Sequence, residues 1–389
     1  GAFYDVPLNA TVLANNGVVI KDVDEPDEPG EETANCYMIT TAGEHSFYAR
    51  QIGNGDKGII PGAGFHVTSS KINPKSAKVL WQDTQGFIDE GSVRLADDGR
   101  VYYTATGNTG NALIAVYSGD GCTGDILWSW HIWGTGDTLP QDNVITTKSG
   151  SSFAIMDRNL GASPSTEDER LQTVRTDEAE RKVCGYMLYQ WGRKDPYRNM
   201  AAGSINERPE INPAWKTVTG NTVYWNDWNI QNAWSSWEKR NNYPLCFMYS
   251  RTYYDGRDYN WVKYETAPTH YLWFTPKTNF DPCPAGYRIP TQQEFDVDYT
   301  LDDDGNIGFT VVADRQFNPL PAQGYLKFDG TPRFIGQEVT LWTCQPYATG
   351  AGQLGAYNFD YYIGEPSSLT NTDLVNRSFA MPVRCVKIK

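Results

Sequence analysis

The sequence predicts a mostly β protein that begins with a β-sandwich, and two observations carry this prediction. From residue 34 onward, short runs rich in β-branched and aromatic residues alternate with turn signals such as Gly53-Asn54-Gly55. Helical periodicity is absent from the same stretch, and short strands at this spacing are typical of two packed sheets. The predicted strands are Cys36–Thr40, Ser46–Arg50, Lys78–Trp81, Val101–Thr104, Ala112–Tyr117 and Ile126–Ile132.

The last of these runs contains a histidine between tryptophans. Side chains alternate between the two faces of a strand, so Trp128 and Trp130 share one face while His131 points to the other. A single histidine in a strand of apolar residues is far more often a hydrogen-bonded core residue than a ligand. We therefore expect a structural role for His131.

Composition shifts divide the chain into three parts. Residues 1–33 hold short β-like runs followed by the acidic Pro/Gly segment Asp22–Glu32, which we interpret as a solvated linker. Residues 34–142 form the predicted β-sandwich. The polar, turn-rich stretch Asp137–Gly150 marks the boundary to the second domain, residues 143–389.

Charge and composition exclude several classes of partner. A formal charge of −14 argues against a nucleic-acid surface, which requires clustered Lys and Arg. No apolar run approaches the ~20 residues of a transmembrane helix. Aromatic residues make up 13% of the chain and charged residues only 21%, which favours a loop-rich extracellular β protein over a charged helical one.

Six sequence motifs follow one another in the second half of the chain. They are Met156–Ala162 (MDRNLGA), Cys184–Tyr197 (CGYMLYQWGRKDPY), Phe280–Phe295 (FDPCPAGYRIPTQQEF), Phe317–Gly330 (FNPLPAQGYLKFDG), Thr340–Gln345 (TLWTCQ) and the closing SFAMPVRCVK. In this order they resemble the Fib_succ_major paralogous domain, a C-type-lectin-like family. The resemblance spans roughly residues 143–389 and rests most strongly on the CPAGYRIPTQQEF segment.

This resemblance implies an α+β, C-type-lectin-like second domain, with a helix near Cys184–Trp191. The start ANCYMIT and the end LWSWHIW of the first domain also resemble a sandwich module found beside fimbrial and surface-protein domains of Gram-negative anaerobes. A protein of this kind is secreted or anchored at the outer membrane. The expected location is therefore the cell surface, in a fimbria or on the outer membrane.

Local signals within the main motif predict a cross-link and a cap. A disulfide between Cys283 and Cys385 would tie this motif to the terminal strand-like run Pro382–Ile388. Thr291 stands three residues before Glu294, the spacing of a capping box at a helix start. Seven cysteines is an odd number, so at least one thiol is free or pairs elsewhere, and the pairing of the other five stays open.

Residues 213–276 form a long insertion rich in Trp, Tyr, Asn and Asp. Neither a period of 2 nor one of 3.6 persists there, which indicates a long structured loop. Aromatic platforms beside polar side chains suit a sugar, which presents apolar C–H faces and hydroxyls; a local aromatic core is the alternative. The predicted recognition residues are Trp225, Asp227, Trp228, Trp234, Trp237, Tyr253, Tyr254, Asp255, Arg257 and Trp261.

Metal and enzyme signals are weak. Asp302, Asp304 and Asn306 offer alternating oxygen ligands, but an Asp-Gly-Asn hairpin turn within Tyr299–Phe309 explains them without calcium. WND at Trp225 and EPS at Glu365 stand in the reverse of the order found in calcium-dependent lectins, so we interpret both as chance. No hydrolase or zinc-protease motif is present, and we expect neither enzyme activity nor a cofactor.

The leading hypothesis is a non-catalytic cell-surface binding protein, a fimbrial tip or minor-subunit adhesin. It would recognise a glycan, or a host or bacterial surface protein, through residues 213–276. The alternative is a structural pilus subunit whose N-terminal strand pairs with other fimbrial subunits. A third hypothesis is an enzyme related to formylglycine-generating enzymes, which share the C-type-lectin-like fold. Their two cooperating thiols have no evident counterpart here, because Cys344 lacks a second partner.

Overall fold

The structure is a computed structural model of the whole chain. The residues that it describes are 33–60, 69–162, 187–198, 244, 272–303, 305–311, 317–327, 332–348 and 354–389. Within them the fold is mostly β, as predicted. Helical backbone in this part of the chain is limited to the short 3-10 turns η1 (Gly55–Gly58), η2 (Asp120–Cys122), η5 (Gln292–Phe295) and η6 (Pro366–Ser368). None of these turns has the length or apolarity to cross a bilayer.

Two sheets make up the N-terminal part. The four-stranded sheet has the order β1 (Cys36–Ile39), β7 (Ile126–Thr135), β6 (Thr109–Tyr117), β3 (Ser76–Gln82), and the three-stranded sheet has the order β2 (Gly43–Tyr48), β5 (Arg100–Ala105), β4 (Ile88–Leu95). All six predicted strands are confirmed. Strand β4 escaped prediction because its polar sequence IDEGSVRL is largely exposed and its register with β5 is irregular.

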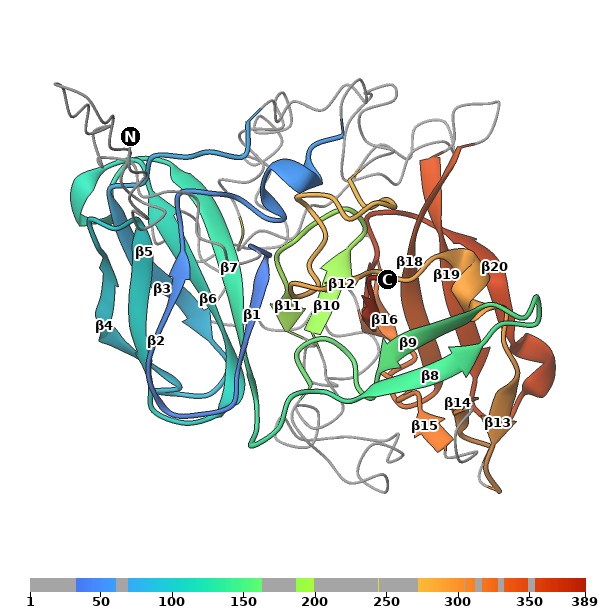
Figure 1. Ribbon diagram of the computed structural model, residues 1–389. Coiled ribbons are helices and arrows are strands. Elements are labelled where there is room, and N and C mark those ends of the chain that lie inside the picture. The colour runs from blue at the N-terminus through green and yellow to red at the C-terminus, as the bar shows by residue number, and fades with distance from the viewer. Residues whose placement is uncertain are drawn as a thin grey trace, which may run out of the picture.

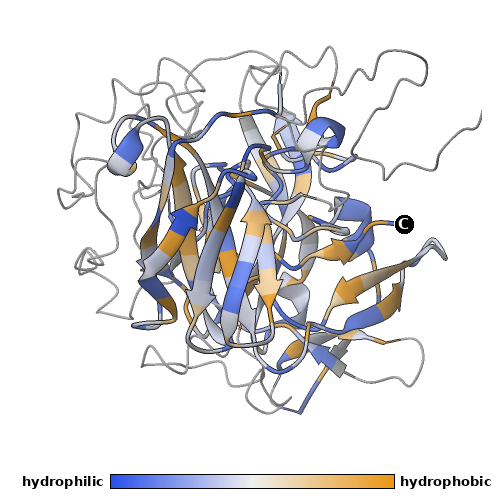
Figure 2. Cartoon of the chain, turned by 60° about the vertical axis from the view of Figure 1, so that its left-hand side comes forward, coloured by the Kyte–Doolittle hydropathy of each residue, from blue (hydrophilic) through white to orange (hydrophobic). Residues whose placement is uncertain are grey.

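Aromatic rings join these two sheets. The ring of Phe47 on β2 lies 4.9 Å from that of Trp130 on β7 and 6.2 Å from that of Tyr103 on β5. Burial alternates strictly along β5, as a strand with one face on a core requires. Figure 2 shows apolar and polar residues mixed along the strands in the same way.

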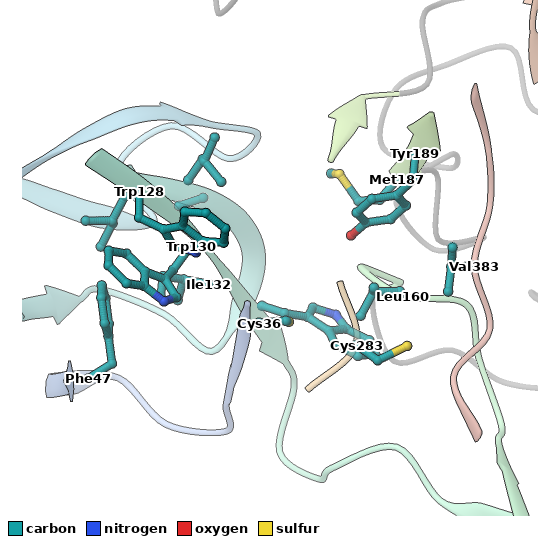
Figure 3. Close-up of a cluster of buried hydrophobic side chains, with 14 of the residues drawn as sticks. Cys36, Phe47, Trp128, Trp130, Ile132, Leu160, Met187, Tyr189, Cys283 and Val383 are labelled. Atoms are coloured by element: carbon teal, nitrogen blue, oxygen red, sulfur yellow. The ribbon is translucent and has the colours of Figure 1, made fainter. Parts of the chain in front are cut away.

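Strands β6 and β7 are buried on both faces, because the C-terminal part packs against the other side of their sheet. One apolar cluster runs from Phe47 and Trp130 to Met187, Tyr189 and Val383. Figure 3 shows some of these side chains, with Cys36 between the rings of the N-terminal sheets and the side chains of the C-terminal part. The two parts therefore share a core.

The C-terminal part consists of many short strands in small antiparallel sheets. A five-stranded sheet has the order β11 (Tyr197–Arg198), β10 (Met187–Gln190), β21 (Ala380–Met381), β16 (Tyr325–Leu326), β17 (Pro332–Arg333). A four-stranded sheet has the order β12 (Tyr287–Arg288), β22 (Val386–Lys387), β9 (Ser152–Met156), β8 (Asp142–Thr146). Two three-stranded sheets are β13 (Tyr299–Leu301), β14 (Ile307–Thr310), β15 (Phe317–Pro319) and β18 (Glu338–Ala348), β19 (Leu354–Tyr362), β20 (Thr370–Val375).

In the described ranges, no strand that precedes the Asp137–Gly150 stretch pairs with β8, which lies in this stretch, or with any later strand. Strands β1 to β7 pair with one another, and β8 to β22 pair with one another. The two groups lie on opposite sides of the molecule in Figure 1. Of the second group, β10, β11 and β12 lie in the middle, toward the first group.

The helix implied for Cys184–Trp191 is wrong, because Met187–Gln190 is strand β10. This strand pairs with β11 at Leu188 and with β21 at Tyr189, and all four of its side chains are buried. A strand buried on both faces gives a continuous apolar run, which periodicity alone cannot distinguish from a buried helix. The backbone partners on either side decide the outcome.

Two local predictions in the C-terminal part are confirmed. Tyr299–Phe309 is the hairpin β13–β14, and its turn is fixed by Asp302, whose carboxylate accepts hydrogen bonds from the backbone and side-chain amides of Asn306. The capping box closes the 3-10 turn η5, where the Glu294 carboxylate accepts from the Thr291 backbone N–H at 2.7 Å. Only one helical turn follows this cap.

Candidate functional site: the frame of the aromatic insertion

The predicted recognition residues lie outside the described part of the chain. These are Trp225, Asp227, Trp228, Trp234, Trp237, Tyr253, Tyr254, Asp255, Arg257 and Trp261. The described chain leaves β11 at Arg198 and resumes at Leu272, apart from Pro244. The structure therefore describes the last residues of the insertion, 272–276, and the chain that follows them.

Paired aromatic residues join the chain end before residue 199 to the chain end after residue 271. Trp191, just after β10, lies 5.7 Å from Trp273, and both rings are fully buried. The indole of Trp191 donates to the carbonyl of Thr343, and that of Trp273 donates to the carbonyl of Phe280. Trp273, the last tryptophan of the insertion, thus belongs to the local core.

Gly192 allows the close approach of these ends. Its φ of +89° lies in the region that favours glycine, and a Cβ at this position would lie 2.6 Å from Cδ1 of Leu272. A larger residue would push Leu272 out of its buried position. The glycine therefore sets how closely the chain after β10 approaches the last residues of the insertion.

The predicted disulfide between Cys283 and Cys385 is present. Both half-cystines are fully buried, and their Cα atoms lie 5.9 Å apart. The bond closes a loop of 102 residues and joins the turn before β12 to the chain entering β22. The turn that follows the insertion is thereby tied to the last strand.

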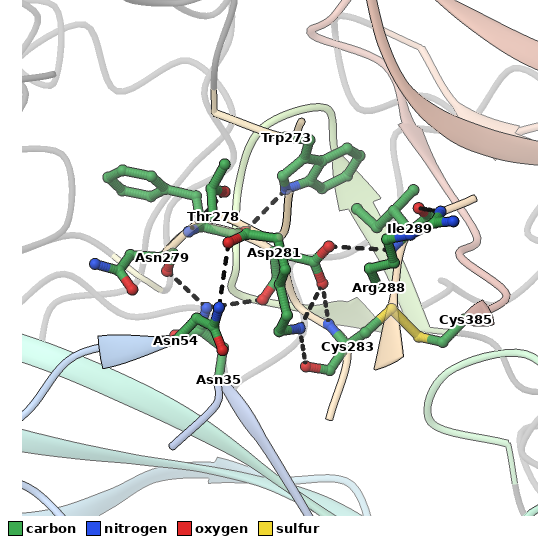
Figure 4. Close-up of polar contacts among 12 residues, drawn as sticks. Asn35, Asn54, Trp273, Thr278, Asn279, Asp281, Cys283, Arg288, Ile289 and Cys385 are labelled. Atoms are coloured by element: carbon green, nitrogen blue, oxygen red, sulfur yellow. Dashed lines mark hydrogen bonds and ion pairs between the residues drawn. A yellow bond between two sulfur atoms is a disulfide. The ribbon is translucent and has the colours of Figure 1, made fainter. Parts of the chain in front are cut away.

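Asp281 is the polar centre of this turn (Figure 4). One carboxylate oxygen accepts from Lys277 Nζ at 2.9 Å and from the Cys283 backbone N–H at 2.8 Å, and the other accepts from the Ile289 N–H at 3.0 Å. Lys277 Nζ also donates to the Cys283 carbonyl at 2.7 Å. Both ionic side chains are buried, and this hydrogen bonding is what a buried ion pair requires.

Asn35 connects the turn to the N-terminal sheet. Its side-chain amide donates to the carbonyls of Asn279 and Asp281, each at 2.8 Å, and its side-chain oxygen accepts from the Trp128 indole at 2.9 Å. Gly58 accepts a further hydrogen bond from the Asn279 backbone. Residues 277–281 are therefore fixed to the N-terminal part by side-chain and backbone contacts together (Figure 4).

A second buried ion pair lies between the two parts. Lys194 Nζ donates to Asp195 Oδ1 and to the Ser129 hydroxyl, each at 2.6 Å, and Ser129 donates to the same carboxylate. Desolvation lowers the pKa of Lys194, while the charge of Asp195 opposes this shift. The ammonium group also lies 4.4 Å from the ring centroid of Trp128. Strand β7 is thus bound to the chain that leads into β11.

His131 has the structural role expected for it. Its Nε2 lies 2.8 Å from Asn111 Oδ1, and its Nδ1 lies 3.4 Å from the Tyr189 hydroxyl. Because the Asn111 amide donates to Asp83, its oxygen faces His131, which places the imidazole proton on Nε2. Complete burial lowers the pKa of His131 to about 3, so the ring is neutral at physiological pH.

The described free thiols are Cys36, Cys122 and Cys344. Burial raises the pKa of Cys344 to about 12, and it also raises that of Cys36 well above its usual value. Thiols in such surroundings remain protonated and are weak nucleophiles. Nor do the described residues contain a group of three or more His, Cys, Asp and Glu side chains placed to hold a metal ion.

Sequence reasoning found the disulfide but missed the polar frame around it. The missed residues are Asn35, Lys194, Asp195, Lys277 and Asp281. Only Asp281 carried a usable signal, since it stands two residues before a predicted half-cystine inside the FDPCP turn. The frame holds segments in place, because its charged groups are buried and bonded to one another.

Comparisons with protein-family models, with curated proteins and with solved structures gave no match. The resemblance to the Fib_succ_major paralogous domain therefore rests on the sequence motifs alone.

Proposed function

We propose that this chain is a non-catalytic cell-surface binding protein, a fimbrial tip or minor-subunit adhesin. In this proposal a β-sandwich precedes a C-type-lectin-like domain. The ligand is a glycan or a surface protein, and residues 213–276 recognise it.

The observation that carries the proposal is the buried frame at the C-terminal end of an aromatic, Asn- and Asp-rich insertion. Trp191, upstream of the insertion, packs on Trp273 near the C-terminal end of the insertion, and the disulfide and the Asp281 network fix the turn that follows. Recognition loops are typically long segments positioned by a rigid scaffold. The buried ion pairs of the frame suit this positioning role.

A glycan array tests this proposal. The wild type and a variant with Trp228, Trp234 and Trp237 all changed to Ala are compared, after circular dichroism has shown that both are folded. The matched control is Trp81→Phe, a tryptophan of the N-terminal sheets. Selective binding by the wild type and the control, lost in the triple variant, supports an adhesin that uses the insertion. Binding that survives the triple substitution contradicts it.

A second candidate, the structural pilus subunit, is favoured by the position of β1. This strand follows residues 1–32 directly and is an outer strand of its sheet. An outer strand offers backbone groups to which a strand of a neighbouring subunit can bind. Concentration-dependent oligomers that disappear when residues 1–30 are deleted would support this candidate; a monomer at all concentrations would contradict it.

A further inference from the structure

Four aromatic side chains from separate elements of the C-terminal part form one partly exposed surface. Tyr325 on β16 stacks on Phe379 with ring centroids 5.3 Å apart, and it lies 6.1 Å from Phe334. Phe334 meets Tyr362 on β19 edge to face at 5.4 Å. We call these four rings the aromatic surface; β16, β18 and β19 around it are labelled in Figure 1.

Phe334 occupies a costly backbone conformation on this surface. Its φ is +52°, a region that bulky side chains rarely adopt, and its side chain is 38% exposed. The turn maintains this conformation because the Phe334 carbonyl accepts from the backbone N–H groups of Gln337 and Glu338. Burial of the ring does not explain the cost, and strained residues of this kind concentrate at functional sites.

Two buried carboxylates lie beneath the rings. Glu338 is 3% exposed and stands opposite Tyr362 in the β18–β19 register, and the Tyr362 hydroxyl hydrogen-bonds to it. Asp360 is 8% exposed. Desolvation, followed by the charges of Glu338 and Asp360, raises the pKa of Tyr325 to about 12. Burial and the same two carboxylates also raise the pKa of Tyr362.

We propose that the aromatic surface is a second binding site, separate from the insertion, for a sugar ring of a neutral glycan. The exposed ring of Phe334 offers a face to the C–H groups of a pyranose. The Tyr325 hydroxyl offers a hydrogen bond beside it, and the Tyr362 hydroxyl, which donates to Glu338, can still accept one. Apolar rings with a few convergent polar groups are the usual composition of a small-molecule site. Only the choice of a glycan as ligand rests on the proposed function above.

The charges select among glycans. Glu338 and Asp360 disfavour a sialylated or sulfated sugar, because an added negative charge would approach two carboxylates. A cationic ligand is less favoured than a neutral one, since Arg333 stands opposite Tyr325 in the β16–β17 register and already supplies positive charge. The surface therefore fits a neutral sugar best.

The decisive variant is Phe334→Gly. Glycine adopts a φ of +52° without strain, which offsets the ring contacts that this variant loses, so it should remain folded while the exposed ring is removed. Leu139→Ala is the matched control, because Leu139 is 50% exposed and lies outside the aromatic surface. Both variants and the wild type are compared on an array of neutral, sialylated and sulfated glycans. The strongest neutral glycan is then titrated by calorimetry.

The expected result is a neutral glycan whose affinity falls at least about tenfold in Phe334→Gly and is unchanged in Leu139→Ala. Tyr362→Phe, which removes one hydroxyl, lowers the same affinity less. Equal affinities in the wild type and Phe334→Gly overturn the proposal, as does displacement by a lysine-rich peptide or an absence of any bound neutral glycan. The Trp228/Trp234/Trp237→Ala variant distinguishes the two sites. If this variant loses glycan binding and Phe334→Gly retains it, the insertion is the binding site and the proposal for the aromatic surface is overturned.

Discussion

The N-terminal and C-terminal parts of this chain are stabilised by different interactions. Strands β1 to β7 have 4 to 10 residues each and pack through rings such as Phe47 and Trp130. Several of the later strands have only 2 residues each, namely β11, β12, β16, β17, β21 and β22. Such short ladders supply few hydrogen bonds, so the segments they join depend on other contacts, whereas β18 and β19 are long strands of 11 and 9 residues.

Buried cationic side chains supply many of those contacts. Arg384 donates to the side-chain oxygens of Asn159 at 2.8 Å and Asn318 at 2.9 Å, and it is fully buried. Arg377 donates to the Gly355 carbonyl at 2.8 Å and lies 4.4 Å from the ring centroid of Trp191. Desolvation lowers the pKa of Arg377 to about 9. Irregular backbone is thus held in place where a long polar side chain reaches backbone carbonyls, as Arg377 does, or side-chain amides, as Arg384 does.

The largest expected effect comes from removing the disulfide in the C-terminal part. In the chain-entropy description, opening a loop of 102 residues costs about 4–5 kcal/mol of unfolding free energy. Cys283→Ala/Cys385→Ala should lower stability by this amount in urea unfolding, whereas the control Cys122→Ala should change it by less than about 1 kcal/mol. In hydrogen exchange, β12 and β22 should lose protection before β6 and β7. Equal loss in both parts would contradict the distinction drawn between them.

The next effect comes from the Asp281 network. Asp281→Asn keeps the shape of the side chain but leaves the Lys277 ammonium buried without its counter-charge. Breaking a buried pair in this way costs about 3–5 kcal/mol. The double variant Lys277→Met/Asp281→Asn should recover part of this loss, because the unpaired charge is gone. A double variant no more stable than Asp281→Asn alone would show that the charge is not the cause.

The N-terminal part should respond to pH through His131. Its folded pKa of about 3 lies below the usual ~6.5 of an unfolded chain, so unfolding takes up a proton between these values. Stability attributable to this group is complete above pH 6.5 and falls as the pH drops, by about 2–3 kcal/mol at pH 4.5. His131→Gln should remove this slope in unfolding measured between pH 7 and pH 4.5. A slope identical to that of the wild type would assign it to other groups.

The sequence predicted the first part of the fold better than the second for a physical reason. Runs such as Val101–Thr104 have one face on a core, so buried and less buried side chains alternate along them and the sequence shows a period of two. The strand β10 has no such pattern, because backbone partners and packed side chains surround it on every side. The polar β4 has too few buried residues to show one.

The frame of the insertion was only partly predictable for a related reason. A cysteine can be recognised in the sequence as a candidate for a disulfide by its residue type alone. The contacts of Asn35 and Lys194 form only when segments distant in the sequence meet in the fold. Asn35 contacts residues almost 250 positions away, with separations of 244 and 246. Periodicity reflects residues that are close in the sequence. Contacts between residues this far apart therefore produce no recognisable pattern around either residue.

The smallest expected effect is the same acid-to-amide substitution made at the surface of the N-terminal sheets. Glu44 on β2 pairs with Arg94 on β4 at 3.1 Å, but the two side chains are 56% and 53% exposed. Arg94 also lies 4.5 Å from the ring centroid of Tyr102, a contact that does not need Glu44. Glu44→Gln should therefore lower stability by less than about 1 kcal/mol in urea unfolding. Asp281→Asn makes the same chemical change at a buried site. The ratio of the two losses of unfolding free energy therefore measures how much burial contributes. Losses of similar size would mean that the polar frame stabilises the fold no more than a surface pair does.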